Sequence, residues 1–156
     1  MRQIMLDILN IIMTGISLIL NSTPVFGIVL VILVLLGEKR NSKRAKIAIA
    51  IFIALIIGFA LKEMYKVPRP CITEPGGVTC PNDYSFPSLH AIGAFALMIP
   101  FINKEKFAYY LLFALLTAFT RIYLGVHTIE DIAAGLVVAS ISCYAIDRLF
   151  PKGEKD

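Results

Sequence analysis

The apolar residues of this chain fall in long runs instead of alternating with polar residues at a short period. About 30 Å of hydrocarbon needs roughly 20 helical residues, so runs of this kind are typical of membrane-spanning helices. The chain is 58% hydrophobic, with a mean hydropathy of +0.78. This pattern predicts an all-α fold, a six-helix transmembrane bundle that forms one domain over residues 1–156. The expected helices cover about residues 4–20, 24–36, 47–61, 88–102, 107–124 and 129–150.

The first apolar run, residues 4–20, has one property of a secretory signal, because Arg2 precedes it. Asp7 and Asn10 interrupt the run, however, and no Ala-x-Ala cleavage site follows it. We therefore expect a retained helix and not a cleaved signal.

The lysines and arginines separate by side of the predicted bundle. Eleven of the fifteen lie on one side, namely Arg2, Lys39, Arg40, Lys43, Arg44, Lys46, Lys104, Lys106, Arg148, Lys152 and Lys155. Because cytoplasmic loops are enriched in Lys and Arg, we expect this side and both termini to be cytoplasmic in a multi-pass protein of the cell membrane. The other four, Lys62, Lys66, Arg69 and Arg121, lie on the outer side, against this bias. Their position indicates binding of an anion, and the distribution by loop argues against nucleic acid as the partner.

The outer polar segment also contains two of the three cysteines. Cys71 and Cys80 are separated by a segment rich in Gly and Pro. In an oxidising compartment they would close a small disulfide loop beside the site, and otherwise they remain two free thiols. Cys143 lies inside the last predicted helix, where we expect it to fill apolar space.

The polar side chains of the outer face suit a phosphoryl group. Arginine matches phosphate oxygens with a planar fork, and lysine adds a point charge. A hydroxyl at a helix N-terminus adds a donor next to unpaired amides, which carry partial positive charge. The residues concerned are Lys62, Arg69, Ser88, His90, Arg121, His127 and Asp131.

The two histidines are expected to have complementary roles. His127 and Asp131 are four residues apart, so they share one helix face if the last helix begins by His127. A carboxylate on one ring nitrogen fixes the tautomer and leaves the other nitrogen as a nucleophile. His90 would then protonate the leaving oxygen and later activate water. Glu130 is a rival to Asp131, but its spacing from His127 is the less expected one.

Each of these residues alone also has a structural interpretation. Ser88 can serve only as the N-cap of the fourth helix, and a histidine in a membrane protein is often a hydrogen-bonded structural residue. Lys62 and Lys66 can extend along the end of the third helix to reach the membrane surface. The nearby acids are expected to be solvated: Glu63, Glu74 and Asp83.

The ordered combination is more specific than its parts. The segments Lys62-x6-Arg69-Pro70, Pro87-Ser88-x-His90 and Arg121-x5-His127-x3-Asp131 resemble the three-part signature of the type-2 phosphatidic acid phosphatase superfamily. That superfamily includes membrane lipid phosphate phosphatases and shares its site with vanadium haloperoxidases. The resemblance covers nearly the whole chain, because the six-helix plan and the outer-face site also match.

The resemblance implies a role for each site residue. It implies phosphate binding by Lys62, Arg69, Ser88 and Arg121, a leaving-group acid at His90, a phosphohistidine at His127 and an orienting acid at Asp131. It also implies that no metal or other cofactor is needed, and the two distant histidines do not have metal-ligand spacing. Two positions depart from the family pattern. Leu89 replaces the usual glycine and would crowd the phosphate if the backbone amide must approach closely, whereas Thr120 replaces a serine and keeps the hydroxyl.

The leading hypothesis is a metal-independent lipid phosphatase that uses a phosphohistidine. Its expected substrate is a polyprenyl (undecaprenyl-type) diphosphate, with phosphatidylglycerophosphate and phosphatidic acid as alternatives. A lipid phosphotransferase with the same intermediate is a second hypothesis. A channel, transporter or scaffold is a third, although the spans contain almost none of the charge that a transport path requires. The sequence leaves the oligomeric state open.

Overall fold

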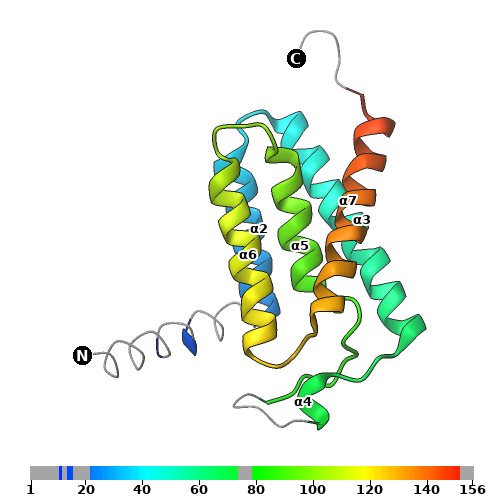
Figure 1. Cartoon of the computed structure of the whole chain (residues 1–156). Helices are drawn as coiled ribbons and strands as arrows, with labels where there is room; N and C mark the ends of the chain where they lie inside the picture. The colour runs from blue at the N-terminus through cyan, green and yellow to red at the C-terminus, as the bar shows by residue number, and fades with distance from the viewer. Residues whose placement is uncertain (1–10, 12–13, 16–21, 74–78, 152–156) are drawn as a thin grey trace.

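The computed structural model describes residues 11, 14–15, 22–73 and 79–151, and within them it contains helices and no strands (Figure 1). The predicted first helix, residues 4–20, lies outside the described residues except for three positions. The helices are α2 (Thr23–Gly37), α3 (Asn41–Tyr65), α4 (Pro70–Thr73), α5 (Leu89–Met98), α6 (Phe107–Tyr123) and α7 (Ile129–Leu149), and a 3₁₀ helix, η1 (Ile99–Phe101), follows α5.

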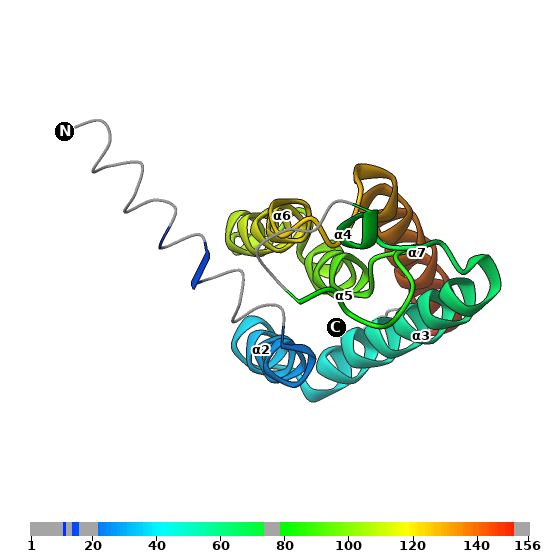
Figure 2. The same cartoon turned by 90° about the horizontal axis from the view of Figure 1, so that it is seen from below.

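Helix α5 forms the centre of the bundle, with α2, α3, α6 and α7 around it (Figure 2). Every residue from Ala91 to Met98 is buried. A helix that is apolar on all sides must be covered on all sides. The other long helices therefore expose one face to the surroundings and pack the other against α5.

Helix α3 is longer at both ends than the predicted range of 47–61. It begins at Asn41, inside the basic segment that was expected to be a loop, and ends at Tyr65. Lysine, arginine and alanine are good helix formers, so the helix continues beyond the apolar run. Arg44 donates to the carbonyl oxygen of Leu35 at 2.8 Å and so ties this first turn to the end of α2. At the other end the extension places Lys62 within the helix.

The fourth predicted helix, residues 88–102, is shorter as an α-helix because of a proline. The α-helix ends at Met98, and Pro100 lies in η1. Pro100 has no amide hydrogen to donate to the carbonyl of Ala96. The buried thiol of Cys143 in α7 contacts that oxygen at 3.5 Å, within the range of a weak hydrogen bond. Cys143 therefore does more than fill apolar space.

Two glycines allow α3 and α7 to approach α5 closely. A Cβ atom at Gly58 would lie 2.3 Å from a side-chain atom of Ile92. A Cβ atom at Gly135 would lie 3.3 Å from both the amide nitrogen of Ile92 and the carbonyl oxygen of Ser88. The atoms near Gly135 belong to the backbone of α5, which cannot rotate away as a side chain can. The absence of a side chain at Gly135 therefore determines how close α7 lies to the start of α5.

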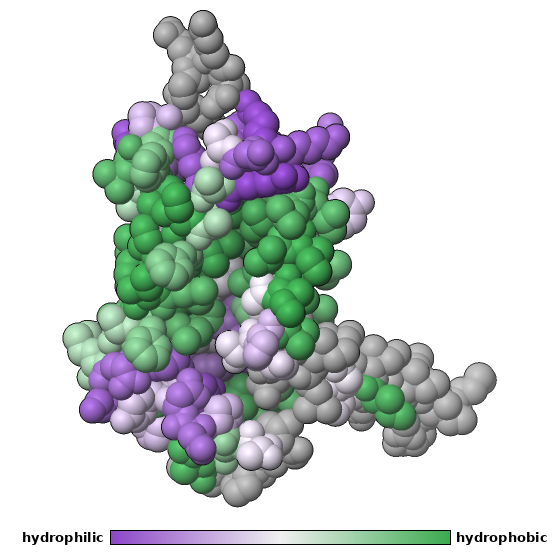
Figure 3. All heavy atoms as spheres, turned by 180° about the vertical axis from the view of Figure 1, so that it is seen from behind, coloured by the Kyte–Doolittle hydropathy of each residue, from purple (hydrophilic) through white to green (hydrophobic). Residues whose placement is uncertain are grey.

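The outside of the bundle carries an apolar belt between two polar ends (Figure 3). Among the described residues, α3 and α7 are long and apolar enough to cross a membrane, and three shorter apolar helices lie beside them. Large apolar side chains are exposed along the belt, including Phe52, Phe59, Leu112, Val137 and Ile141. Such a belt is typical of a protein in contact with lipid.

Candidate active site

The predicted site residues meet at one end of the bundle, where α3 and α6 end and α5 and α7 begin (Figure 1). A cavity of about 350 Å³ lies there, and five of the predicted residues line it: Lys62, Arg69, His90, Arg121 and His127. The loops that connect α2 to α3 and η1 to α6 lie at the opposite end together with the start of α3. These segments contain seven of the twelve described lysines and arginines: Lys39, Arg40, Lys43, Arg44, Lys46, Lys104 and Lys106.

The pairing of His127 with Asp131 arises from a helix cap. Helix α7 begins at Ile129 and not at His127, with Thr128 as its N-cap. The Asp131 carboxylate returns to the Thr128 amide, with 2.9 Å between Oδ2 and N, and the Thr128 hydroxyl accepts from the Asp131 amide. The same Oδ2 atom lies 3.2 Å from Nδ1 of His127. The predicted pair therefore meets, although the two residues do not share a helix face, while Glu130 is exposed.

The neighbours of His127 determine its tautomer. The Asp131 carboxylate contacts Nδ1 of the His127 ring, and Nη1 of Arg69 lies 3.0 Å from Nε2 of the same ring. Because an arginine only donates, Nε2 must hold the lone pair and Nδ1 the proton. Burial, helped by the charges of Arg69 and Lys62 and opposed by the hydrogen bond to Asp131, lowers the pKa of His127 to about 4. The imidazole is therefore neutral at physiological pH.

Three buried cations surround the cavity. Lys62 donates to the carbonyl oxygens of Tyr84 and Ser85. The side chain of Arg121, at the end of α6, is held by the hydroxyl of Thr120, which lies 3.3 Å from both Nε and Nη2. Thr120 thus provides a hydroxyl contact to Arg121. Burying positive charge is costly unless negative charge lies close to it, so the concentration of three cations around one cavity favours an anionic ligand.

Asp83 contacts two of these cations, contrary to the expectation that it is solvated. Its Oδ1 atom lies 2.6 Å from Nη2 of Arg69, and its Oδ2 atom lies 3.3 Å from Nζ of Lys62. Although burial raises the pKa of Asp83, the hydrogen bond and charge of Arg69, together with Lys62, lower it below its ordinary value. Asp83 is therefore an ionised member of the site.

Ser88 and His90 occupy different positions at the start of α5. The side chain of Ser88 is completely buried and caps the helix, accepting from the Ala91 amide at 3.4 Å. The structure thus gives Ser88 the capping contact, and its predicted contact with phosphate stays a prediction. His90 lines the cavity, and its buried Nε2 atom has no hydrogen-bond partner among the described residues. A buried ring nitrogen without a partner needs a ligand or water to satisfy it.

Leu89, in the position of the family glycine, also lines the cavity. Its Cδ2 atom would lie 2.9 Å from a Cβ atom at Gly58 of α3. The leucine side chain therefore extends over the one position on α3 that has no side chain of its own. Gly58 thus leaves the space that the Leu89 side chain occupies.

The segment between α3 and α5 is held in place by a disulfide and by a main-chain hydrogen bond, in which the Ser85 amide donates to the carbonyl oxygen of Val67 at 2.8 Å. Cys71 and Cys80 are bonded, with their Cα atoms 5.7 Å apart. The disulfide joins the short helix α4, which directly follows Arg69, to the loop that carries Asp83. The disulfide therefore holds the segment next to Arg69 close to the segment that carries Asp83, the ion-pair partner of Arg69.

Two residues of the site were not identified from the sequence as members. Asp83 was assigned to solvent, and Ser85 was not considered. The Ser85 hydroxyl is buried, donates to Oδ2 of Asp131 and lies 3.4 Å from Nδ1 of His127. Both residues lie in a loop, where spacing gives no direction for a side chain. Their closeness to the Pro87-Ser88-x-His90 segment was the only available signal.

Fold and site together define a helical protein with an apolar belt, a cavity lined by three cations and a histidine–aspartate pair beside that cavity. A model of the PAP2 superfamily matches residues 43–154, so the chain belongs to the PAP2 superfamily. This confirms the family indicated by the three sequence segments.

Two curated relatives show how the chain compares with other members. It is 34% identical over 121 residues to undecaprenyl-diphosphatase BcrC of Bacillus subtilis, covering 74% of this chain and 63% of the relative. It is 27% identical over 103 residues to human sphingosine-1-phosphate phosphatase 2, covering 57% of this chain and 25% of the relative. The chain thus spans less than two thirds of the length of either relative.

A solved structure has the same fold. The crystal structure of a transmembrane PAP2-type phosphatidylglycerolphosphate phosphatase from Bacillus subtilis matches with a TM-score of 0.68 at 19% identity. The match covers 90% of this chain and 76% of the other. Together with the apolar belt and the family match, it identifies the chain as a membrane protein.

Proposed function

We propose that this protein is a metal-independent lipid phosphatase that works through a phosphohistidine at His127. The observation that carries the proposal is the orientation of this imidazole. Nδ1 faces a buried carboxylate, and Nε2 holds a lone pair at the edge of a cavity surrounded by cations. A neutral, oriented imidazole next to an anion site has the requirements of a nucleophile for phosphoryl transfer.

The reaction proceeds in two displacements at phosphorus. Lys62, Arg69 and Arg121 bind the phosphoryl oxygens, and the charge of Asp131 stabilises the imidazole as it loses electron density. His90 enters the reaction as the imidazolium, beside the negative charge of the bound phosphoryl group. Nε2 of His127 forms a bond to phosphorus while the bond to the leaving oxygen breaks, and that oxygen takes a proton from the His90 imidazolium. Neutral His90 then removes a proton from water, whose oxygen attacks phosphorus and releases His127 and inorganic phosphate. Ser88 is proposed to assist through its hydroxyl or the adjacent amides.

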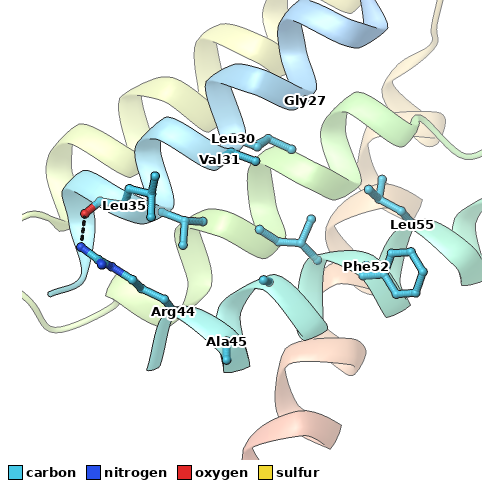
Figure 4. Close-up of a pocket in the computed structure, with 11 residues that line it drawn as sticks. Gly27, Leu30, Val31, Leu35, Arg44, Ala45, Phe52 and Leu55 are labelled. Atoms are coloured by element: carbon cyan, nitrogen blue, oxygen red, sulfur yellow. Dashed lines mark hydrogen bonds between the residues drawn. The ribbon is translucent and has the colours of Figure 1, made fainter. Parts of the chain in front are cut away.

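An apolar pocket between α2 and α3 supports a substrate with a long hydrocarbon tail (Figure 4). Its volume is about 460 Å³, and it extends from Gly27 and Leu55 to the level of Arg44. Thr23 lines the site cavity one helical turn before Gly27, and Lys62 lies two turns beyond Leu55. Because one turn rises about 5.4 Å, a tail attached to a phosphoryl group in the cavity reaches this pocket within about 6–11 Å.

Among lipid substrates we propose a polyprenyl diphosphate, because the relative that is 34% identical is an undecaprenyl-diphosphatase. With such a substrate the terminal phosphorus is attacked, and the polyprenyl monophosphate leaves. We propose that the site opens to the outer face of the membrane and the basic loops to the cytoplasm, which the positive-inside rule supports.

The test is release of inorganic phosphate by the detergent-purified protein, in EDTA, from a polyprenyl diphosphate, phosphatidylglycerophosphate and phosphatidic acid. We expect release to be fastest from the polyprenyl diphosphate and to fall about a thousandfold or more in His127→Ala, because the nucleophile is lost. Glu63→Gln, which changes an exposed acid on the same side, serves as the matched control.

Two results would contradict the proposal. Phosphate release that persists in His127→Ala would exclude the histidine as nucleophile, and release that EDTA abolishes would exclude a metal-independent reaction. Transfer to an added alcohol in preference to water would identify a phosphotransferase.

A further inference from the structure

Asp83 approaches the buried cations of the site from the solvent side. Its side chain is 49% exposed, whereas those of Lys62 and Arg69 are 2% and 6% exposed. One carboxylate oxygen contacts each cation, and Asp83 itself lines the cavity. The carboxylate therefore lies between the bulk solvent and the two cations assigned to the phosphoryl group.

The contacts of Arg69 leave it poorly placed to accept a phosphoryl group without rearrangement. Nε and Nη2 donate to Oδ1 of Asp83, while Nη1 contacts the carbonyl oxygen of Val126 and Nε2 of His127. Carboxylate and phosphate oxygens are both preferred acceptors of the guanidinium fork. These contacts use four of the five N–H hydrogens of Arg69, so a phosphoryl group that binds the guanidinium at two points must displace at least one of the present partners.

The donors of Lys62 are occupied in the same way as those of Arg69. Its ammonium group contacts the carbonyl oxygens of Tyr84 and Ser85 and the carboxylate of Asp83. An ammonium has three hydrogens, and three oxygens already surround it. Of these, only the Asp83 side chain can move away without moving the main chain.

We propose that the Asp83 carboxylate occupies part of the phosphate site in the substrate-free protein and competes with phosphate for Lys62 and Arg69. This inference rests on the proposed function, since it assigns those two cations to the phosphoryl group. When a phosphoryl group enters, Asp83 withdraws toward solvent, and Arg69 releases the lone pair of His127. When inorganic phosphate leaves, Asp83 returns and keeps the buried cations paired. Asp83 thus weakens retention of the product and favours ligands with more than one negative charge.

Competition by the Asp83 side chain can be tested without displacing Arg69, because a main-chain contact also holds Arg69. Nε of Arg69 also contacts the carbonyl oxygen of Asp83 at 3.0 Å, and this contact does not depend on the side chain. Asp83→Asn keeps the size of the side chain and removes its charge. Asp83→Glu keeps the charge, and Glu130→Gln removes an exposed acid at the same end of the molecule.

The experiment measures equilibrium binding of radiolabelled inorganic phosphate to the full-length, detergent-purified protein, alongside its inhibition of lipid hydrolysis. We expect Asp83→Asn to bind phosphate about tenfold more tightly, which corresponds to removing a competitor worth about 1.4 kcal/mol. We expect Asp83→Glu and Glu130→Gln to stay within about threefold of the unchanged protein.

Phosphate binding that is unchanged or weaker in Asp83→Asn would overturn the inference, and weaker binding would identify Asp83 as a positioning residue for Arg69. Because binding is measured without turnover, the two proposals fail separately. Normal hydrolysis with unchanged phosphate affinity defeats only the competition. Tighter phosphate binding in Asp83→Asn, in a protein that hydrolyses no lipid, defeats only the proposed function.

Discussion

His127 combines a neutral ring with a fixed tautomer, and both follow from its contacts. Burial and two nearby cations disfavour the imidazolium more than the Asp131 carboxylate favours it, so its pKa lies near 4. The nucleophilic form is therefore present above about pH 4 and is lost as the pH falls through that value. An ordinary histidine would lose it already near pH 6.5.

The chain has two histidines, which makes this prediction directly measurable. In His90→Asn only His127 remains, and the NMR shift of its ring carbon-bound proton should titrate with a midpoint near 4. The same measurement after Asp131→Asn is added to His90→Asn should show no higher midpoint, because that change removes the charge that favours the imidazolium. A midpoint at or above 6.5 in His90→Asn would contradict the contacts described here.

The sequence predicted which residues meet more reliably than how they meet. Lys62, Arg69, His90, Arg121 and His127 were expected together, and they line one cavity. His127 and Asp131 were expected on one helix face, yet they meet through the N-cap of α7. A shared helix face and an N-cap can both bring residues four apart into contact, so the sequence spacing does not distinguish between these two geometries.

Loop residues were the least predictable part of the site. Asp83 was expected to be solvated because exposed acids near a membrane surface usually are, and its partners lie 14 and 21 positions earlier in the chain. The limits of α3 were also wrong, because the hydropathy of a segment changes at the membrane surface while its helix continues. Neither error concerns the apolar core, where burial leaves few alternatives.

At the scale of helices, the approach of α7 to α5 brings Asp131 to the start of α5. The amide nitrogen of Ser88 donates to the carbonyl oxygen of Asp131 at 3.2 Å, next to the glycine contact at Gly135. Gly135→Ala places a Cβ atom 3.0 Å from the Cβ atom of Ala91 and 3.3 Å from backbone. The helices must separate by a few tenths of an ångström.

We expect Gly135→Ala to cost about 1–3 kcal/mol of stability and to lower the rate of phosphate release as well. Gly27→Ala is the matched control, since a Cβ atom there meets nothing within 4 Å. It should leave stability unchanged or raise it by up to about 1 kcal/mol, because alanine favours helix. Thermal unfolding in detergent measures both. Equal unfolding temperatures for the two variants would show that the close approach has no energetic role.

At the scale of the whole molecule, the apolar belt and the two polar ends suggest one orientation in the membrane. Glu130 and Glu105 are both exposed, the first at the site end and the second in the loop before α6 at the basic end. The described cysteines are unsuitable for labelling, since two are bonded and Cys143 is buried. A cysteine introduced at either glutamate therefore reports which side of the membrane that end occupies.

We expect Glu130→Cys to react with a membrane-impermeant maleimide in intact cells, and Glu105→Cys to react only after the cells are permeabilised. The reason is that positively charged loops are retained on the cytoplasmic side, and Glu105 lies at the same end of the bundle as the basic loops. The reverse pattern of labelling would place the site in the cytoplasm.

The measurement that tests the central claim most directly is capture of the phosphorylated protein during turnover. A polyprenyl diphosphate labelled in its terminal phosphate is mixed with the protein, and the reaction is stopped with alkali within milliseconds, because a phosphohistidine survives base and is lost in acid. The account predicts labelled protein in which the phosphoryl group is on the peptide containing His127, and none in His127→Ala. Hydrolysis at the normal rate without labelled protein at any time, or label on another residue, would contradict it.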